Sequence, residues 1–477
     1  MTDFRDLVNL ASERLGAAAI AANDDFFAPK ENLVKDSAAV FREGEYTDRG
    51  KWMDGWETRR RRTPGFDWCI VRLALPGIIR GVVADTSFFK GNYPEACSIE
   101  AMDGNPELGG EWIEILPRST LHGDSENPFA IDCSRRFTHV RLNIYPDGGV
   151  ARLRVYGEVL PDWAGEDKSA YMDLAAIGNG AAVVAASDMF FGSRHNLILP
   201  GPSRNMGDGW ETRRRRGPGY DWVVIKLAGA GEIEQVEVDT SFYKGNYPES
   251  CSLEAAAMLD WRELLPRTEL EADSRKLFHT ELVRGGEVTH VRLNIFPDGG
   301  VARLRVNGRL SRDGRMEHGL RRLNAQSPAA AEAALLRCCG SRRWAELMAK
   351  QRPFGSSQQI LTTAGDLCKQ LTPSDWLEAF AQHPRIGERA DSRWSQQEQS
   401  AAQGAEPQVL AELARLNQEY GSKFGYIYIV CATGKTAGEM LDLLRRRLGH
   451  DPQDELRIAA GEQERIAHLR LEKLLES

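Results

Sequence analysis

Hydrophobic and polar residues alternate with a period of two through most of the first two thirds of the chain. Within the stretch His139–Gly157, the apolar residues Val140, Leu142 and Ile144 alternate with polar positions, a Pro-Asp-Gly-Gly turn follows, and the alternation then resumes. This pattern predicts a β-hairpin with one buried face and one polar face. Because similar short strands recur between Gly-, Pro- and Asp-rich turns without a helical period, we expect sandwiches of the jelly-roll type.

Near residue 312 the pattern changes to a helical one. Apolar residues then recur at three- and four-residue spacing, as at Leu410, Leu413 and Leu416. Such spacing places the apolar side chains on one face of a helix. We therefore expect an all-helical domain over residues 325–477, joined to the β-rich part by a charged linker at 312–324.

One long unit occurs twice in the β-rich part. Three blocks are shared between the copies: DGWETRRRR at Asp54–Arg62 and Asp208–Arg216; DTSFFKGNYPE at Asp85–Glu95, returning with one change at Asp239–Glu249; and HVRLNIYPDGGVARLRV at His139–Val155, returning with one change at His290–Val306. Two homologous jelly rolls are predicted, over residues 1–165 and 166–311. The sequence between the blocks has drifted, so the blocks mark either a shared structural need or a shared site.

The composition is that of a folded multidomain protein. A chain of 477 residues usually needs more than one hydrophobic core, and 42% hydrophobic with 27% charged residues is ordinary globular usage. The formal net charge of −8 repels polyanions, so we expect no nucleic-acid partner. Open sheet edges favour association, and we expect a homo-oligomer.

The chain shows no targeting or metal-binding signature. The N-terminal residues lack a basic region followed by an apolar core, and no apolar run approaches the roughly 20 residues that span a bilayer. The eight cysteines include no C-x-x-C pair, so we interpret them as reduced, packed thiols. We expect a cytoplasmic protein without a membrane partner.

The arginine-rich block can be interpreted in two ways. If the block is a strand, Glu57, Arg59 and Arg61 point to one face. Guanidinium groups beside a carboxylate form a receptor for a small anion that carries carbonyl groups, because each guanidinium can hold a carboxylate by two hydrogen bonds. The alternative is a set of internal ion pairs that brace the two sheets.

The other two blocks carry further candidate chemistry. Asp85 ends a strand, and the following loop supplies Lys90 and Asn92, at the kind of sandwich end where ligands bind. His139 and His290 stand at matched strand starts, where a histidine could transfer a proton. A histidine in a strand is more often structural, and this alternative stays open.

Together, the three duplicated blocks resemble allantoicase over residues 1 to about 311. The resemblance implies two jelly rolls and the hydrolysis of allantoate to ureidoglycolate and urea. The candidates to activate water or protonate the leaving urea are Glu57, Asp85, His139, Glu211, Asp239 and His290. The candidates to bind substrate are Arg59, Arg61, Lys90, Asn92, Arg213, Arg215, Lys244 and Asn246. A divalent metal could bind through Asp and His ligands, but no ligand spacing demands one.

The helical part carries a separate set of motifs. HPRIG stands at His383–Gly387, WSQQEQ at Trp394–Gln399, and NQEYGSKFGYIYIVCATGKT and IAHLRLEKL follow in that order. These motifs resemble OHCU (ureidoimidazoline) decarboxylase, a carboxy-lyase. The resemblance implies that His383 is the catalytic acid, that Glu398 is its partner, and that no cofactor is needed. The implied substrate contacts are Pro384, Ser395, Gln396, Gln397, Gln399, Tyr428, Ile429, Val430, Cys431, Ala432 and Arg470.

The sequence thus predicts a bifunctional purine-catabolic enzyme that acts on small molecules. Two other interpretations stay open. The duplicated sandwiches could be a binding module, for example for carbohydrate, although sugar sites usually present aromatic platforms where these repeats carry Arg, Asp and Lys. Alternatively, only one part is active and the other is a relic or an assembly scaffold.

Overall fold

In the computed structural model, the chain forms two compact units, residues Met1–Arg315 and Met316–Ser477. The structure describes residues 3–163, 167, 170–257, 260–383 and 407–476.

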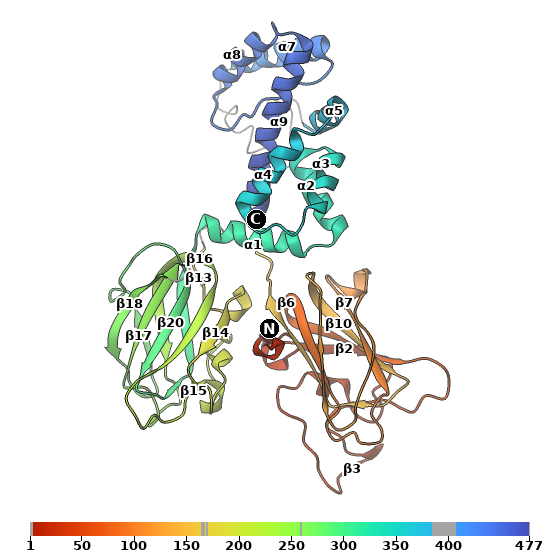
Figure 1. Ribbon diagram of the computed structural model, residues 1–477, viewed down its shortest axis with the longest axis vertical. Helices are drawn as coiled ribbons and strands as arrows, with labels where there is room; N and C mark the ends of the chain where they lie inside the picture. Colours follow the sequence, from red (N-terminus) through yellow and green to blue (C-terminus); the bar gives the residue numbers. More distant parts are fainter. Residues whose placement is uncertain (1–2, 164–166, 168–169, 258–259, 384–406, 477) are drawn as a thin grey trace. The chain divides into compact units, whose positions relative to one another are not determined.

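The first repeat is built around one long bent strand (Figure 1). β6 (Asp67–Asp85) pairs with β10 and β2 through its first half, and with β12 and β9 through its second half, so it contributes to both layers of the sandwich. The order in the main sheet is β1-β12-β6-β10-β7-β8. The remaining strands are β1 (Val8–Asn9), β2 (Ala18–Ala22), β3 (Tyr46–Thr47), β4 (Gly50–Lys51), β5 (Trp56–Glu57), β7 (Ala96–Met102), β8 (Ile113–Thr120), β9 (Glu126–Ala130), β10 (Arg136–Tyr145), β11 (Gly149–Val150) and β12 (Arg152–Val159).

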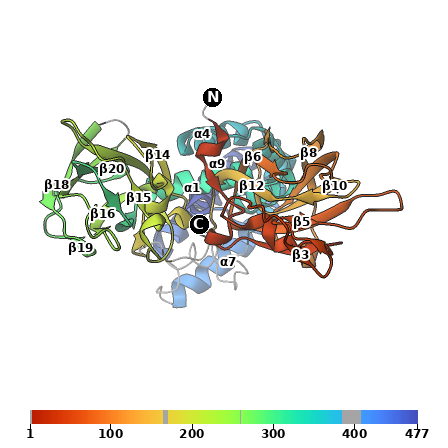
Figure 2. The same ribbon diagram turned by 90° about the horizontal axis from the view of Figure 1, so that it is seen from below.

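The second repeat builds the same sheet around β16 (Asp221–Asp239), in the order β13-β22-β16-β20-β17-β18. Figure 2 labels β16, β18 and β20 of this sheet. Its other strands are β13 (Met172–Asp173), β14 (Ala182–Ala186), β15 (Trp210–Glu211), β17 (Ser250–Ala257), β18 (Asp260–Glu269), β19 (Arg275–Phe278), β20 (Val288–Phe296), β21 (Gly300–Val301) and β22 (Arg303–Leu310). Short 3-10 helices lie at Phe4–Asp6, Glu13–Leu15, Lys30–Val34, Pro106–Leu108, Ile177–Asn179, Arg194–Ile198 and Met206–Asp208.

The predicted alternation is confirmed in β10. Val140, Leu142 and Ile144 are fully buried and form part of the core, whereas Arg141 between them forms an ion pair with Glu100 on β7. A strand with this period can bury one set of side chains and leave the other set polar. The tandem duplication of jelly-roll domains is therefore observed as expected.

The arginine block departs from the simple strand considered above. Only Trp56 and Glu57 are in a strand, β5, which pairs with β11. The β5–β11 pairing ends at Glu57. Beyond it, the Thr58 N–H still donates to the Gly148 carbonyl, but the Arg61 N–H donates to the Asp147 side chain rather than to a neighbouring strand. The side chains of the block therefore do not alternate between two faces of a sheet.

The two repeats differ between these matched elements. In the first repeat the chain from Leu33 to Asp54 includes the β3–β4 hairpin, whereas in the second repeat the shorter stretch from Leu197 to Asp208 contains no such hairpin. Figure 1 shows β3 at the lower end of the first sandwich. The hairpin is thus a feature of one copy.

The second unit is helical, so the expected all-α domain is confirmed. Its described helices are α1 (Arg312–Ala325), α2 (Pro328–Cys339), α3 (Arg342–Lys350), α4 (Ser357–Cys368), α5 (Pro373–Ala381), α7 (Pro407–Phe424), α8 (Ala437–Arg447) and α9 (Pro452–Leu475). α2, α4 and α5 all contact the long helix α9. No described helix is both long and apolar enough to cross a membrane.

The segment expected to be a linker, residues 312–324, forms helix α1 instead. The Ser311 hydroxyl accepts a hydrogen bond from the Gly314 N–H near the start of this helix. Met316, Leu320 and Leu323, at helical spacing, are buried in the helical core. Burial of this apolar face explains why a highly charged segment is ordered as a helix.

Candidate active sites

A pocket of about 470 Å³ lies at one end of the first sandwich, around the duplicated blocks. Glu57, from the first block, and Asn92, from the second, meet here, with the Asn92 Nδ2 donating a 2.7 Å hydrogen bond to the Glu57 Oε1. The third block holds this arrangement, because the Gly149 N–H donates to the Asn92 carbonyl at 2.8 Å. The three blocks that are far apart in sequence therefore build one site.

A glycine is required where the third block meets the second. Gly148 has a φ of 138°, and a Cβ atom there would lie 2.7 Å from the Asn92 carbonyl oxygen. Gly299 and Asn246 repeat this relationship in the second copy, with the same φ and the same 2.7 Å approach. Only glycine combines this backbone conformation with so close an approach, which accounts for the repeated Pro-Asp-Gly-Gly turn.

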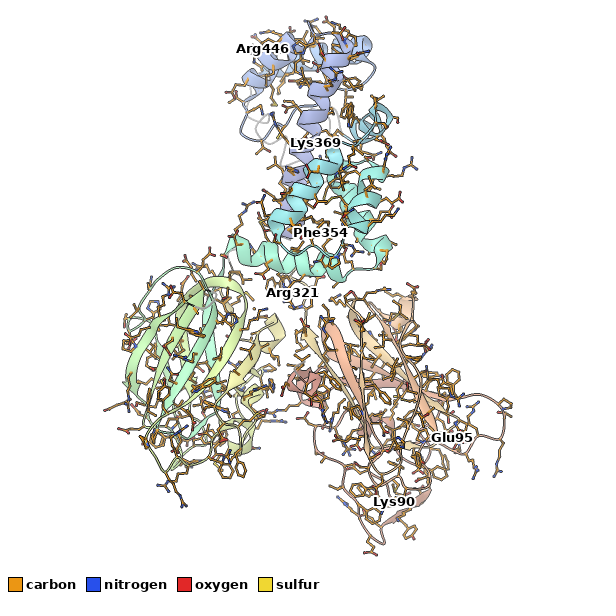
Figure 3. All side chains as sticks on the ribbon, in the orientation of Figure 1. Lys90, Glu95, Arg321, Phe354, Lys369 and Arg446 are labelled. Atoms are coloured by element: carbon orange, nitrogen blue, oxygen red, sulfur yellow. The ribbon has the colours of Figure 1, made fainter. Side chains whose placement is uncertain are left out.

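Aromatic and cationic side chains complete the pocket. Phe41 and Phe88 stack with ring centroids 5.8 Å apart, and the Lys51 ammonium lies 4.5 Å from the centre of the Phe41 ring. Lys90 also lines the pocket, and Figure 3 shows it at the lower end of this sandwich. The other lining residues are Phe27, Gly50, Met53 and Gly91. Cationic groups and flat rings suit a small planar anion.

Glu57 has the properties of an acid–base group. Its side chain is half-buried, and burial raises the pKa of this carboxyl group, while the hydrogen bond from Asn92 acts in the opposite direction. A carboxyl group whose pKa is raised keeps its proton to higher pH, so it can donate this proton to a leaving group and later take one from water.

The counterpart in the second repeat is altered. The Asn246 Nδ2 donates to the Glu211 Oε1 at 2.6 Å, as in the first copy. The Met206 sulfur, however, lies 3.4 Å from the same amide nitrogen, and the Met206 carbonyl accepts a hydrogen bond from the Tyr243 hydroxyl at 2.7 Å. The Glu–Asn pair is duplicated, but its surroundings are not.

The candidate arginines hold internal carboxylates. Salt bridges join Arg59 to Asp24 and Arg61 to Asp67, both at 2.6 Å, and the same pairs recur as Arg213 with Asp188 at 3.2 Å and Arg215 with Asp221 at 2.6 Å. Asp67 and Asp221 begin the long strands β6 and β16, so two of these pairs anchor the block to the sheet. Arg213 and Arg215 also line a second pocket of about 340 Å³, with Ser187 and Asp188.

The histidine candidates lie away from the Glu57 pocket. His139 is near the start of β10, six residues before Tyr145 at its other end, a span of about 20 Å along the strand. Its Nδ1 lies 2.9 Å from the Thr138 hydroxyl, and burial together with Arg72 lowers its pKa. His290 has the equivalent contact with Thr289. His139 and Glu57 therefore cannot act on the same atom of a small substrate.

The aspartate candidates cap the ends of the long strands. Asp85 accepts a hydrogen bond from the Ser87 N–H at 2.8 Å, and Asp239 accepts one from the Ser241 N–H at 2.7 Å. Asp239 is also buried and pairs with Arg275 at 3.2 Å. These contacts order the loop that carries Lys90 and Asn92, and its copy with Lys244 and Asn246, by the usual Asx turn.

In the helical unit, three separated elements meet at one apolar cluster. The cluster contains Phe380 of α5, Ile429 and Cys431 of the segment between α7 and α8, and Ala459 and Ile466 of α9. His383 follows α5 directly, and its N–H donates to the Phe380 carbonyl at 3.1 Å. Arg470 is buried one turn beyond Ile466 on α9. The structure thus brings the elements that carry His383, Arg470 and the predicted segment 428–432 together.

The segment 428–432 is held by two charged residues that the sequence analysis did not single out. Glu462 of α9 accepts the Cys431 N–H at 2.7 Å, and Arg447 of α8 donates to the Ile429 carbonyl at 2.8 Å. Arg447 is in turn held by the buried carboxylate of Glu455. Tyr428, Ile429, Val430 and Cys431 are buried, and Ala432 is half-buried.

Several predicted decarboxylase residues lie outside the described residues: Pro384, Ser395, Gln396, Gln397, Glu398 and Gln399. Within the described ranges, no group of three or more His, Cys, Asp or Glu side chains could hold a metal ion. The pocket residues Lys51, Phe41, Phe88 and Met53 were also not predicted. Phe88 stands inside a duplicated block and could have been found there, whereas Phe41 and Lys51 lie in the Leu33–Asp54 stretch, which is longer than its copy.

Comparisons with known proteins agree with both resemblances. The family model "Allantoicase repeat" matches residues 8–160 and 172–311, and the model "OHCU decarboxylase" matches residues 324–472. A probable allantoicase of Burkholderia mallei is 53% identical over 323 residues, covering 65% of this chain and 96% of the relative. A probable allantoicase of Photobacterium profundum is 51% identical over 321 residues, covering 64% and 97%.

Solved structures are similar to each part. The crystal structure of allantoicase from Saccharomyces cerevisiae is 37% identical, covers 63% of this chain and 92% of that one, and has a TM-score of 0.56. A crystal structure of OHCU decarboxylase in the presence of (S)-allantoin is 42% identical, covers 30% of this chain and 96% of that one, and has a TM-score of 0.28. The chain therefore belongs to the allantoicase family through its two β-domains and to the OHCU decarboxylase family through its helical domain, as a fused enzyme of purine catabolism.

Proposed function

We propose that the β-rich part hydrolyses allantoate to ureidoglycolate and urea in the pocket of the first repeat. The observation that carries this proposal is the half-buried Glu57, held by Asn92 and faced by aromatic and cationic side chains. Allantoate is a small anion with two flat ureido groups on one carbon. Rings such as Phe41 and Phe88 suit the ureido planes, and the Asn92 amide suits a ureido oxygen.

In this mechanism Glu57 acts first as an acid and then as a base. The protonated carboxyl group gives its proton to the nitrogen of one ureido group, the bond from this nitrogen to the central carbon breaks, and the electron pair leaves with urea. The lone pair of the other ureido nitrogen stabilises the resulting cationic carbon. Water then adds to this carbon, and Glu57 takes the released proton, so that one water molecule is consumed for each urea formed.

The experiment that tests this proposal is urea release from allantoate by the full-length protein, with and without a chelator. Release establishes the activity, and loss of release in chelator assigns a metal requirement. If no urea forms under either condition, even with added divalent metal, the hydrolysis is refuted and the β-domains need another role. The alternative role is then a binding or assembly module for the helical enzyme.

For the helical part, we propose cofactor-free, stereospecific decarboxylation of OHCU to (S)-allantoin. The carboxylate leaves as carbon dioxide, the electron pair of the broken carbon–carbon bond passes into the imine and carbonyl system of the ring, and His383 returns one proton to the carbon. Glu398 orients His383 or stabilises its protonated form, and Arg470 binds a carboxylate or ureido oxygen. The meeting of α5, segment 428–432 and α9 in one cluster supports this assignment.

His383→Ala tests this second activity. We expect accelerated decarboxylation to be lost while the far-ultraviolet circular dichroism spectrum is unchanged. His279→Ala, at an exposed position in the β-rich part, is the matched control and should keep the wild-type rate. Retention of the rate by His383→Ala would remove the histidine from the mechanism.

The two proposed reactions are not consecutive, because allantoin must be opened to allantoate by another hydrolase between them. Direct transfer of a product from one domain to the other is therefore not the reason for the fusion. Equal expression or co-assembly of the two enzymes is a sufficient reason.

A further inference from the structure

The duplication of the Glu–Asn pair raises the question of whether each repeat carries a working site. Both pairs have nearly the same hydrogen bond, 2.7 Å in the first copy and 2.6 Å in the second. A difference in function must therefore come from the residues around the pair. These residues differ because the stretch between Leu33 and Asp54 is longer than its copy.

The long stretch of the first repeat from Leu33 to Asp54, which includes the β3–β4 hairpin, supplies much of the pocket wall. Phe41, Gly50, Lys51 and Met53 all come from this stretch, and all line the pocket beside Glu57. The hairpin also covers the adjacent ring of Phe27, which is only half-exposed and lies against Gly50. The stretch thus closes one side of the site and adds one positive charge to it.

In the second repeat, the shorter stretch leaves the aromatic residues Phe190 and Phe191 exposed, and its Met206 contacts the Glu211–Asn246 pair. The exposed fractions of Phe190 and Phe191 are both 63%, since no hairpin covers them. The Met206 sulfur contacts the Asn246 amide, and its carbonyl is fixed by Tyr243, which stands where the first repeat has Phe89. The amide that would meet a ureido oxygen is thus partly capped by the protein itself.

The cation best suited to bind a carboxylate is Lys51. The candidate arginines Arg59 and Arg61 are neutralised by Asp24 and Asp67. Lys90 lies 3.7 Å from the Asp124 carboxylate, and its copy Lys244 has the same kind of partner in Asp273. Lys51, in contrast, has no carboxylate partner among the ion pairs of the described residues, and its ammonium lies 4.5 Å from the centre of the Phe41 ring.

We propose that each chain carries one allantoate-hydrolysing site, in the first repeat, and that Lys51 of the repeat-specific hairpin binds the substrate carboxylate there. This inference rests on the proposed hydrolysis. The second repeat then serves as a structural partner whose Glu211–Asn246 pair is a remnant of the duplication. An ammonium group on an aromatic face, without a competing carboxylate, is free to bind an anion at little cost in lost contacts.

The first test compares matched variants of the full-length protein. We expect Glu57→Gln to lower kcat for urea release by about 100-fold or more, and Glu211→Gln to leave kcat within about twofold of wild type. Equal losses of about half in both variants would show two equivalent sites and overturn the inference. A loss confined to Glu211→Gln would place the site in the other repeat.

The second test addresses Lys51. We expect Lys51→Met to raise KM for allantoate by about 10- to 100-fold with kcat changed far less, because a charged hydrogen bond to the ground-state carboxylate is lost. Lys51→Arg should restore most of the affinity, and Lys369→Met, in the helical domain, is the control for loss of one exposed positive charge. An unchanged KM in Lys51→Met would remove Lys51 from the site.

Calorimetric titration of Glu57→Gln with allantoate provides a readout that does not depend on turnover. One molecule bound per chain supports the inference, and two overturn it. The proposed function fails separately, because wild-type protein that releases no urea under any condition refutes the hydrolysis itself. Wild-type release together with full activity in both Glu57→Gln and Lys51→Met refutes only the assignment of the site.

Discussion

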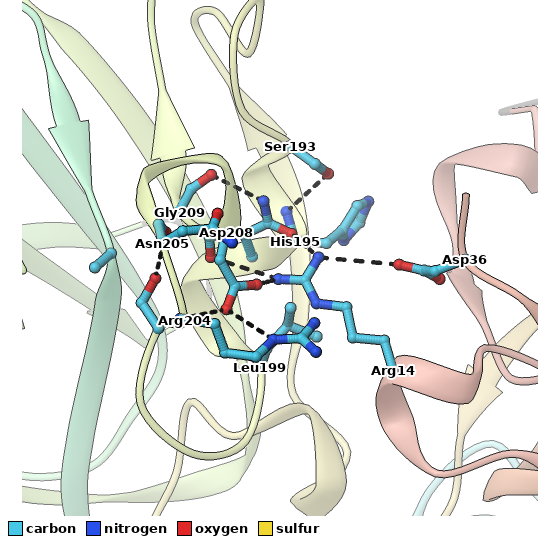
Figure 4. A network of polar contacts seen from close by, with 12 residues as sticks. Arg14, Asp36, Ser193, His195, Leu199, Arg204, Asn205, Asp208 and Gly209 are labelled. Carbon is cyan, nitrogen blue, oxygen red and sulfur yellow. Dashed lines mark hydrogen bonds and ion pairs between the residues drawn. The ribbon is translucent and has the colours of Figure 1, made fainter. Parts of the chain in front are cut away.

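Arg14 of the first repeat forms an ion pair with Asp208 of the second repeat (Figure 4). Arg303 pairs with the same carboxylate at 3.1 Å. Arg14 also donates to the Asn196 side chain at 3.1 Å. In the first repeat, the matching carboxylate of Asp54 is held by Arg152 and Lys35, both from its own repeat. The two copies are thus linked by a contact that the duplication itself did not create.

This relationship predicts unequal effects of two substitutions on stability. Arg14→Ala leaves Asp208 paired with Arg303, so we expect a loss of about 1–2 kcal/mol in the free energy of unfolding of the β-rich unit. Arg303→Ala leaves Asp208 paired with Arg14, but it removes a buried guanidinium that also donates to the Gly201, Asp208 and Ala302 carbonyls. Because several buried acceptors then lose their donor, we expect a larger loss, of about 3–5 kcal/mol. Differential scanning calorimetry of the full chain should show a larger fall in Tm for Arg303→Ala. A fall of equal size in both variants would contradict this assignment of roles.

The pH dependence of urea release should report on Glu57. Burial raises the pKa of this carboxyl group, so its protonated form persists to higher pH than that of an exposed glutamate. If Glu57 must donate a proton, kcat falls as the pH rises through this raised pKa. The alkaline limb of the kcat profile should therefore lie above the usual range for glutamate.

Substitution of Asn92 tests whether Glu57 is the group that sets the alkaline limb of the kcat profile. Its hydrogen bond favours the charged form and so lowers the pKa of Glu57. Asn92→Leu should shift the alkaline limb to still higher pH, whatever it does to the absolute rate. A limb that stays in place, or moves to lower pH, would show that another group titrates.

Glu462 is expected to act as a positioning residue in the decarboxylase. Its carboxylate accepts the Cys431 N–H at 2.7 Å and so holds the segment that is proposed to contact substrate. Glu462→Ala should lower kcat/KM for OHCU by about 10-fold, while Glu462→Gln, which keeps an acceptor oxygen, should restore most of it. Glu346→Ala removes an exposed glutamate of the same domain and is the control. If the Gln variant were as impaired as the Ala variant, the negative charge rather than the hydrogen bond would matter.

Substitution of the buried Glu455 should lower the free energy of unfolding of the helical unit. Its side chain is fully buried and accepts hydrogen bonds from Arg447 at 2.7 Å and from Tyr420 at 2.5 Å. Glu455→Ala leaves the Arg447 guanidinium buried without its partner, at a cost of about 3–5 kcal/mol. Thermal unfolding followed by circular dichroism should detect this loss.

A double variant separates the charge from the packing. Replacing Arg447 by Met and Glu455 by Leu removes both charges together, and we expect it to be more stable than Glu455→Ala. Arg447 also holds the Ile429 carbonyl, so the double variant should still be impaired in decarboxylation. A double variant no more stable than Glu455→Ala would show that the loss comes from packing.

Periodicity and duplication were sufficient to predict the kinds of element and the repeated domains, and the sequence motifs carried the resemblance to the two families. The alternation of Val140, Leu142 and Ile144 is a local property, because successive side chains of a strand point to opposite faces whatever the rest of the chain does. Repetition of long identical blocks likewise needs no structure to be recognised. The end of the strand after Glu57 and the packing of helix α1 both depend on partners distant in sequence, so local spacing alone does not determine them.

The sequence by itself thus determined two jelly rolls, a helical domain and the residue types that could act, since these follow from local spacing and from motifs. Only the tertiary structure decided which of these residues meet. In the folded protein Asn92 donates a hydrogen bond to Glu57, and Arg59 and Arg61 form ion pairs with internal aspartates. His139 lies near the opposite end of its strand from Tyr145. The tertiary structure also brought Lys51 from an unrepeated hairpin to a repeated pair. Such meetings depend on how strands and loops distant in sequence pack together, which no short stretch of the chain encodes.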